Sequence, residues 1–305
     1  MTARPIRVTD QPQARSSLDP SRPFGTHIRM ARWKSIILIA ALPLTLLLSQ
    51  LALYLLAGLI EGGDPLAPTL TPLKLLAANL STGLTALLAV VLVTWFAKVP
   101  WRSVFSSPRR FDFRRIGIYL LGSAVLMGIS TAAVGLVAPE ATGWGSFGIT
   151  GTTLAMLVVV LLTTPLQSAG EEVIFRGAIM PAAGSWFRAV QPAFITGLVI
   201  SSLAFALVHG SSDPALFSFY IFLSAATVVM GLITRGLEAA IAFHVANNLV
   251  ASTVNALFAG GGVLTIDRSE GQGGGAALLI PAVMILFVLG MVWLLDRRRR
   301  TTPLR

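Results

Sequence analysis

Two adjacent carboxylates, Glu171 and Glu172, lie with Arg176 inside a segment that is otherwise apolar enough to cross a membrane. A charged side chain at the centre of a membrane helix costs roughly 2.5–3.5 kcal/mol on insertion scales. Glu172 and Arg176 are four residues apart and share a helix face, so an ion pair between them offsets part of that cost. Glu171 lies about 100° around the helix from Glu172. Because it has no partner on that face, we expect Glu171 to serve as a general base.

Two later apolar segments each carry a further polar group at helical spacing. His209 follows Phe205 by four residues, and Asn248 follows His244 by four, so each pair lies on one helix face. Taken alone, His209 is more simply an interfacial residue, and His244 with Asn248 can be a hydrogen-bond clasp between helices. Likewise, Glu172 with Arg176 can be a salt bridge that only locks helices together. Three such groups in one chain are harder to explain by packing, and we expect them to meet in one site.

This set of side chains supports two kinds of water activation. In the first, the carboxylate of Glu171 takes the proton of water while imidazole or amide donors stabilise an oxyanion. In the second, Glu171, His209 and His244 ligate zinc as two histidines and one carboxylate, with an open position for water. The chain has neither the His-Glu-x-x-His motif of zinc peptidases nor a Gly-x-Ser-x-Gly nucleophile elbow. Both mechanisms therefore stay open, and serine chemistry is disfavoured.

Composition places these groups in a membrane. Of the 305 residues, 54% are hydrophobic and 12% charged, whereas soluble domains carry about 25% charged residues. The chain has no cysteine, which excludes disulfides, thiolate metal sites and cysteine nucleophiles. Its net charge of +10 comes from arginines at the ends of apolar segments, which indicates membrane topology rather than nucleic-acid binding. We therefore predict an all-α, polytopic bundle of membrane helices.

Eight apolar segments are long enough to span a bilayer, at roughly 20 residues each. They cover about residues 35–60, 75–97, 116–137, 152–180, 192–209, 214–233, 237–258 and 276–295. Pro165 and Gly170 before the glutamates, and Pro181 after them, predict bends in the long fourth segment. Eight spans place 20 of the 23 Lys and Arg residues on one side, leaving Lys74 and Arg268 on the other and Arg176 within the fourth segment. By the positive-inside rule, both termini are predicted to be cytoplasmic.

The chain divides accordingly into four parts. Residues 1–32 are predicted to be a disordered, basic cytoplasmic tail. Residues 33–150 hold three membrane helices, and residues 151–260 hold a core of four that carries every candidate site residue. Residues 261–305 comprise a glycine-rich outer loop, the last membrane helix and a basic cytoplasmic tail. In this scheme His244 lies nearer to the cytoplasmic end of its helix than Glu171 and His209 do. At about 1.5 Å per residue, straight helices would place it at least one or two turns shallower than them, unless the helices are bent or staggered, a span boundary is wrong, or the family geometry is not fully reproduced.

The ordered motifs resemble those of a known family. Glu-Glu-x-x-x-Arg at 171–176, Phe-x-x-x-His at 205–209 and His-x-x-x-Asn at 244–248 are similar to those of the CPBP family of CAAX proteases and bacteriocin-processing proteins, also called Abi. This family includes the Ras-converting type of CAAX prenyl endopeptidase. The resemblance covers about residues 152–258 and implies an intramembrane endopeptidase. It further implies that Glu171 and His209 activate water, and that His244 and Asn248 bind the oxyanion or complete a metal site. Glu172 and Arg176, with Phe205, would support the site.

The expected partners are membrane lipid and a peptide or membrane-protein substrate, without nucleic acid. The resemblance implies either a zinc-assisted or a glutamate-only mechanism, and it does not specify a prenylated substrate or an oligomeric state. The family also includes immunity proteins and scaffolds, so a non-catalytic membrane scaffold is the main alternative. A proton-coupled transporter is less favoured, because the polar cluster has no counterpart in the first half of the chain. Multi-pass insertion in a cell membrane is expected, and the composition favours a bacterial plasma membrane.

Overall fold

The computed structural model describes residues 17–301, so part of the predicted N-terminal tail and residues 302–305 lie outside the described residues. The described chain is all-α except for two strands of two residues each, which confirms the predicted class. The α-helices are α1 (Arg32–Glu61), α2 (Pro72–Ala97), α3 (Phe113–Val137), α4 (Gly151–Glu172), α5 (Met180–Gly184), α6 (Val190–Val208), α7 (Pro214–Thr234), α8 (Glu238–Leu257) and α9 (Leu279–Thr301). Shorter helical segments are η1 (Trp101–Val104), η2 (Pro139–Ala141), η3 (Val173–Ile179, a π-helix) and η4 (Gly275–Leu278).

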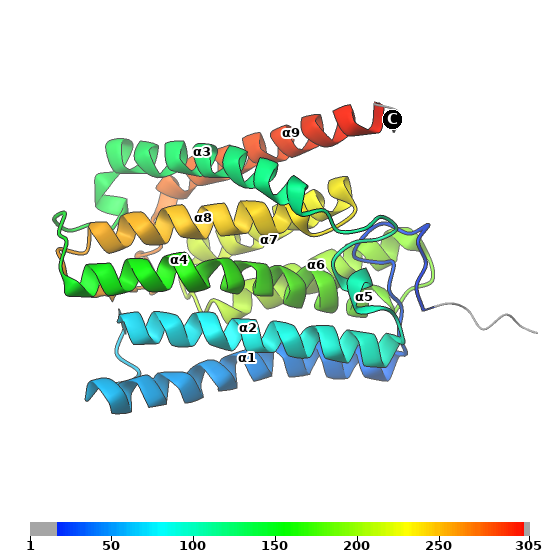
Figure 1. Ribbon diagram of the computed structural model, residues 1–305, viewed down its shortest axis with the longest axis horizontal. Coiled ribbons are helices and arrows are strands. Elements are labelled where there is room, and N and C mark those ends of the chain that lie inside the picture. The colour runs from blue at the N-terminus through cyan, green and yellow to red at the C-terminus, as the bar shows by residue number, and fades with distance from the viewer. Residues whose placement is uncertain (1–16, 302–305) are drawn as a thin grey trace, which may run out of the picture.

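The long helices lie side by side and alternate in direction along the bundle (Figure 1). Within the described residues, seven helical stretches are long and apolar enough to cross a membrane, rather than the eight predicted. The predicted segment 237–258 does form a helix, α8, but its polar side chains exclude it from that group. It runs between α3 and α4 with α7 behind it, and its residues from Glu238 to Ala246 are buried. Because neighbouring helices cover that part of α8, it does not need a fully apolar surface.

Residues 17–31 form a folded segment, here called the N-terminal hook, where the sequence predicted a disordered tail. Leu18 pairs with Ile28 in an antiparallel bridge, and Phe24, His27 and Ile28 are buried against the bundle. His27 Nε2 lies 2.8 Å from the backbone oxygen of Ser103. Burial lowers the pKa of His27 to about 4, so its ring is neutral at pH 7. A few apolar residues in a polar stretch were enough to dock this segment, which average composition did not reveal.

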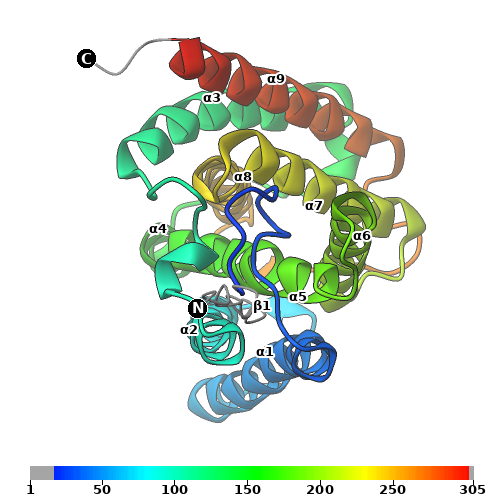
Figure 2. The ribbon, with the colours of Figure 1, turned by 90° about the vertical axis from the view of Figure 1, so that its right-hand side faces the viewer.

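The fourth predicted span bends beside the glutamates. α4 passes directly after Glu172 into the π-helix η3, and α5 then lies across the bundle instead of along it (Figure 2). Single π-helical turns are rare and often occur at functional sites. The hydroxyl of Ser201 on α6 donates to the backbone oxygen of Phe175 at 2.8 Å, which ties η3 to α6. Gly170 permits close packing here, because a Cβ at this position would lie 3.2 Å from Thr82 Cγ2 on α2.

Candidate active site

Glu172 and Arg176 form the buried base of the site. Glu172 is fully buried and Arg176 is 1% exposed. Glu172 Oε2 lies 3.3 Å from Arg176 Nε, as an ion pair that is not aligned as a hydrogen bond. Arg176 also donates from Nη2 to the backbone oxygen of Ser224 on α7 at 3.2 Å, and its guanidinium lies 4.7 Å from the ring centroid of Phe205. The pairing predicted from the four-residue spacing is therefore present. The further contacts of Arg176 join η3 to α6 and α7.

His244 lies between the two carboxylates. Its Nδ1 is 2.7 Å from Glu172 Oε1, and its Nε2 is 3.2 Å from Glu171 Oε2. A neutral imidazole can donate from only one nitrogen, and its other nitrogen is an acceptor. The Nδ1 contact with Glu172 is a hydrogen bond, whereas the Nε2 contact with Glu171 is not aligned as one. The ion pair of Glu172 with Arg176 offsets part of the cost of burying charge in a low-dielectric interior.

This contact shows that the depth expected for His244 was wrong. The prediction counted residues from each cytoplasmic turn as though every helix ran straight along the membrane normal. Because η3 and α5 turn across the bundle, the residues after Glu172 add little depth (Figure 2). His244 consequently meets Glu171 and Glu172 at the same level of the bundle.

Glu171 combines burial with an unsatisfied oxygen. The residue is 6% exposed, and its Oε2 has no aligned hydrogen-bond partner among the described residues, although His244 Nε2 is near. It lines a cavity of about 380 Å³ together with Gln167, His209 and Arg268. A buried carboxylate that lines a cavity and has one oxygen without an aligned hydrogen bond is well placed to accept a proton from a bound water.

His209 caps the end of α6 at the wall of this cavity. Its Nδ1 lies 2.7 Å from the backbone oxygen of Phe205, so Nδ1 carries the hydrogen and the neutral ring presents Nε2 as an acceptor. The ring packs against Phe205 and Tyr220, with centroid distances of 4.4 and 4.2 Å. His209 also lines a second cavity of about 780 Å³, which contacts His244, Asn247 and Asn248. We call these two adjacent cavities the site chamber.

Asn248 lies beside the chamber but is held by α4. Its Nδ2 donates to Gln167 Oε1 and to Ser168 Oγ, both at 3.1 Å, and its Oδ1 accepts from Asn247 Nδ2 at 3.0 Å. Its two amide hydrogens are therefore both engaged. To donate to an oxyanion, Asn248 must exchange one of these bonds.

The chamber wall includes residues that were not predicted from the sequence as site residues, among them Gln167, Arg268 and Tyr220. Gln167 lies one helical turn before Glu171, so the four-residue spacing was a usable signal for it. Arg268 donates from Nη1 to the backbone oxygen of His209 and lines both cavities. It was notable as one of two basic residues on the predicted outer side. Tyr220 packs on His209 through tertiary contact alone, and no sequence signal identifies it.

The structure does not place the predicted zinc ligands around one point. Within residues 17–301, no three His, Cys, Asp or Glu side chains are grouped so that they could hold a metal ion. His244 Nδ1 is engaged by Glu172 Oε1 at 2.7 Å, and among the described residues no third such side chain is grouped with His244 and Glu171. As arranged, these side chains do not fit a zinc ion, and no step below depends on one.

The described chain is thus a multi-pass membrane protein with a buried carboxylate–histidine site beside a chamber. Residues 150–250 match the family described as Rce1-like, type II CAAX prenyl endopeptidase. This segment is about a third of the chain and contains all three motifs, so the resemblance seen in the sequence is confirmed for it. No curated protein and no solved structure matches the chain.

Proposed function

We propose that the protein is an intramembrane endopeptidase that hydrolyses a peptide bond in a membrane-associated protein or peptide. The observation that carries this proposal is the buried, unaligned carboxylate of Glu171 between His244 and a cavity. The family match of residues 150–250 supports the same class of reaction.

In the proposed reaction, Glu171 accepts a proton from water as the water oxygen adds to the carbonyl carbon of the substrate. His209, with Nε2 free to accept, helps to orient that water. Negative charge then develops on the carbonyl oxygen, and donation from Asn248, after exchange of one bond, stabilises it. His244, between the two carboxylates, holds Glu171 in place. As the C–N bond breaks, the leaving nitrogen takes the proton that Glu171 accepted from the water. Glu172 and Arg176 position His244 and contact no substrate.

A non-catalytic scaffold is the second candidate, because the same ion pairs join α4 and η3 to α7 and α8 and would also rigidify the bundle. One experiment separates the two. Protein termini are compared in cells that carry the wild type, Glu171→Gln or Glu140→Gln at matched expression. Glu140 is an exposed residue of η2, so its variant controls for loss of one carboxylate outside the site.

A protease predicts proteins that stay uncleaved with Glu171→Gln and are cleaved normally with Glu140→Gln. Identical termini in all three strains, together with a Glu171→Gln variant that fully restores the phenotype of a deletion, would assign the scaffold function instead.

A further inference from the structure

The chamber lies at one end of the bundle, under the loops that join the helices there. The larger cavity is lined by Leu70 of β1 (Thr69–Leu70), by Thr142–Ser146, and by Phe258–Gly260 and Val263–Ile266. In Figure 1 these connections occupy the left-hand end, opposite the N-terminal hook. The smaller cavity adds Leu46 at the middle of α1, and Gln50 and Tyr54 in its second half, which lie toward the same end.

The path from the chamber toward the other end is closed by packed side chains. Between His244 and the end that carries the N-terminal hook lie five packed side chains, each no more than 1% exposed: Glu172, Arg176, Phe175, Phe205 and Phe243. The N-terminal hook then covers the end itself, where Phe24, His27 and Ile28 are no more than 3% exposed. A polypeptide therefore has no route from that end to Glu171 in this structure.

The closed end is also the basic end. The described Lys and Arg residues placed there are Arg22, Arg29, Arg32, Lys34, Lys98, Arg102, Arg109, Arg110, Arg114, Arg115, Arg188, Arg235, Arg297 and Arg298. The chamber end has Lys74 and Arg268, with Glu61, Asp64, Glu140, Asp267 and Glu270. Basic residues accumulate in the cytoplasmic loops of membrane proteins. The distribution therefore assigns the closed end to the cytoplasm.

From these three observations we infer that the site chamber is entered from the non-cytoplasmic side of the membrane. This inference rests on the proposed protease function and defines its substrate class. The scissile bond belongs to a segment exposed on that side, as in an exported protein or the extracytoplasmic part of a membrane protein. A chain end confined to the cytoplasm would face the closed end.

The chain is well suited to a direct test because it contains no cysteine, so the wild type gives no background. Three single-cysteine variants are compared with a membrane-impermeant maleimide, in intact cells and in inverted membrane vesicles. Ala251→Cys reports on the larger cavity, one turn after Asn247 on α8. Ser146→Cys reports on its exposed rim, and Ala189→Cys reports on the exposed turn between α5 and α6 at the basic end.

We expect positions 251 and 146 to be modified in intact cells, and position 189 only in inverted vesicles. Modification of position 251 only in inverted vesicles would overturn the inference. Failure to modify it from either side, with full modification after unfolding in detergent, would overturn it as well.

This result is independent of whether the protein is a protease, because the labelling needs no turnover. If Glu171→Gln leaves all termini unchanged while position 251 is labelled from outside, the proposed function fails and the orientation stands. If cleavage depends on Glu171 but position 251 is labelled only from inside, the function stands and the substrate class is wrong. If cleavage depends on Glu171 and position 251 is labelled from outside, the proteins that accumulate with Glu171→Gln must expose their cleavage sites outside the cytoplasm.

Discussion

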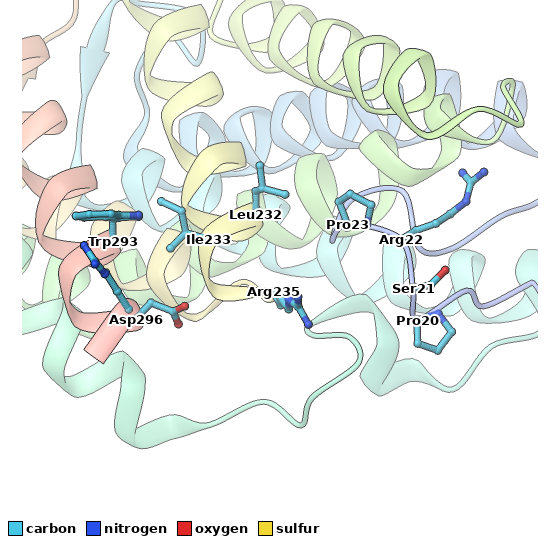
Figure 3. A pocket seen from close by; sticks show the side chains of 10 residues that line it. Pro20, Ser21, Arg22, Pro23, Leu232, Ile233, Arg235, Trp293 and Asp296 are labelled. Carbon is cyan, nitrogen blue, oxygen red and sulfur yellow. The ribbon is translucent and has the colours of Figure 1, made fainter. Parts of the chain in front are cut away.

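Two cavities of similar size lie at opposite ends of the bundle and differ in what lines them. The cavity of about 780 Å³ at the chamber end contacts His209, His244 and Asn248. The cavity of about 680 Å³ at the basic end is lined by the hook residues Pro20–Pro23 and by residues of α7 and α9 (Figure 3). Its carboxylate, Asp296, pairs with Arg115, and Arg22 is directed away to the backbone oxygen of Arg188.

The difference shows that volume alone does not identify the site. At the basic end the carboxylate of Asp296 is paired with Arg115. Among the described residues, those that line the cavity include no histidine, although Arg22 Nη1 and Arg115 Nε are buried without an aligned partner. At the chamber end, an oxygen of Glu171 is buried without an aligned partner, and the neighbouring histidines can exchange protons with it. Acid–base catalysis requires groups that are free to exchange protons. The four predictions below test whether such groups are found at the chamber end of the bundle and not at the basic end.

The largest expected effect is on turnover. Glu171→Gln removes the proposed general base and should lower the cleavage rate by about 10²–10⁴-fold, the usual contribution of general acid–base catalysis. Arg235→Gln, at the wall of the basic-end cavity, should leave the rate within about twofold, because no reacting group lies there. Rates are measured on the substrate identified by comparing termini. Equal losses in the two variants would show that the two ends are not functionally different.

The next effect is on stability. Glu172→Gln leaves Arg176 without its carboxylate and should cost about 3–5 kcal/mol, as expected when one partner of a buried ion pair is removed. Asp19→Asn breaks the partly exposed pair of Asp19 with Arg22 beside the basic-end cavity and should cost no more than about 1 kcal/mol. Denaturant unfolding in detergent measures both. The double variant Glu172→Gln/Arg176→Met should recover part of the loss, and no recovery would contradict the pairing.

The hook should be sensitive to acid. Its His27 has a pKa of about 4 in the fold, against 6.5 for an exposed histidine, because burial disfavours the charged ring. The unfolded hook therefore binds a proton at a higher pH than the folded hook. Its stability is fully present above pH 6.5 and falls as the pH drops toward 4, by at most about 3 kcal/mol at 1.36 kcal/mol per unit.

Hydrogen exchange of residues 17–31 between pH 7 and pH 4 measures this loss, with the loops at the chamber end as internal control. A His27→Gln variant should show a flat profile over that range. An unchanged profile in the wild type would show that the basic end is not closed by a neutral, buried histidine.

The smallest effect concerns the loop over the chamber. Arg268→Gln loses the bond to the backbone oxygen of His209 and should cost about 1 kcal/mol of local stability, the net value of a typical hydrogen bond. We expect faster hydrogen exchange in residues 263–274 and at His209, with global unfolding unchanged. Lys98→Gln, at an exposed position of the basic end, is the control. Identical exchange in both variants would mean that Arg268 does not hold the loop.

Much of the site was predictable because its parts are local. The charges of Glu171, Glu172 and Arg176 are costly in lipid, and four-residue spacings paired Glu172 with Arg176 and placed His244 with Asn248. The partners of His244 and Asn248 were not predictable. Both ring nitrogens of His244 turned out to face glutamates, and the amide of Asn248 donates to Gln167 and Ser168.

The fold, like the site, was predictable only in part. Apolar length predicted the positions of the membrane helices, because lipid demands about 20 apolar residues whatever the neighbours are. The same criterion could not show that α8 lies between other helices, where its polar residues are covered. Nor could it show that Phe24, His27 and Ile28 dock the hook, because that depends on the surface they meet.

By itself, the sequence determined the class of protein, the helical segments, the charge asymmetry between the two ends, and the motifs that bear the chemistry. These follow from the cost of placing each residue in lipid and from the fixed geometry of a helix. Only the tertiary structure decided the depth of His244, the engagement of Asn248, and which end of the bundle is closed. Those depend on the direction of the bend after Glu172 and on contacts between segments far apart in the chain. Pro165, Gly170 and Pro181 predicted a bend, but no local pattern gives its direction or those contacts.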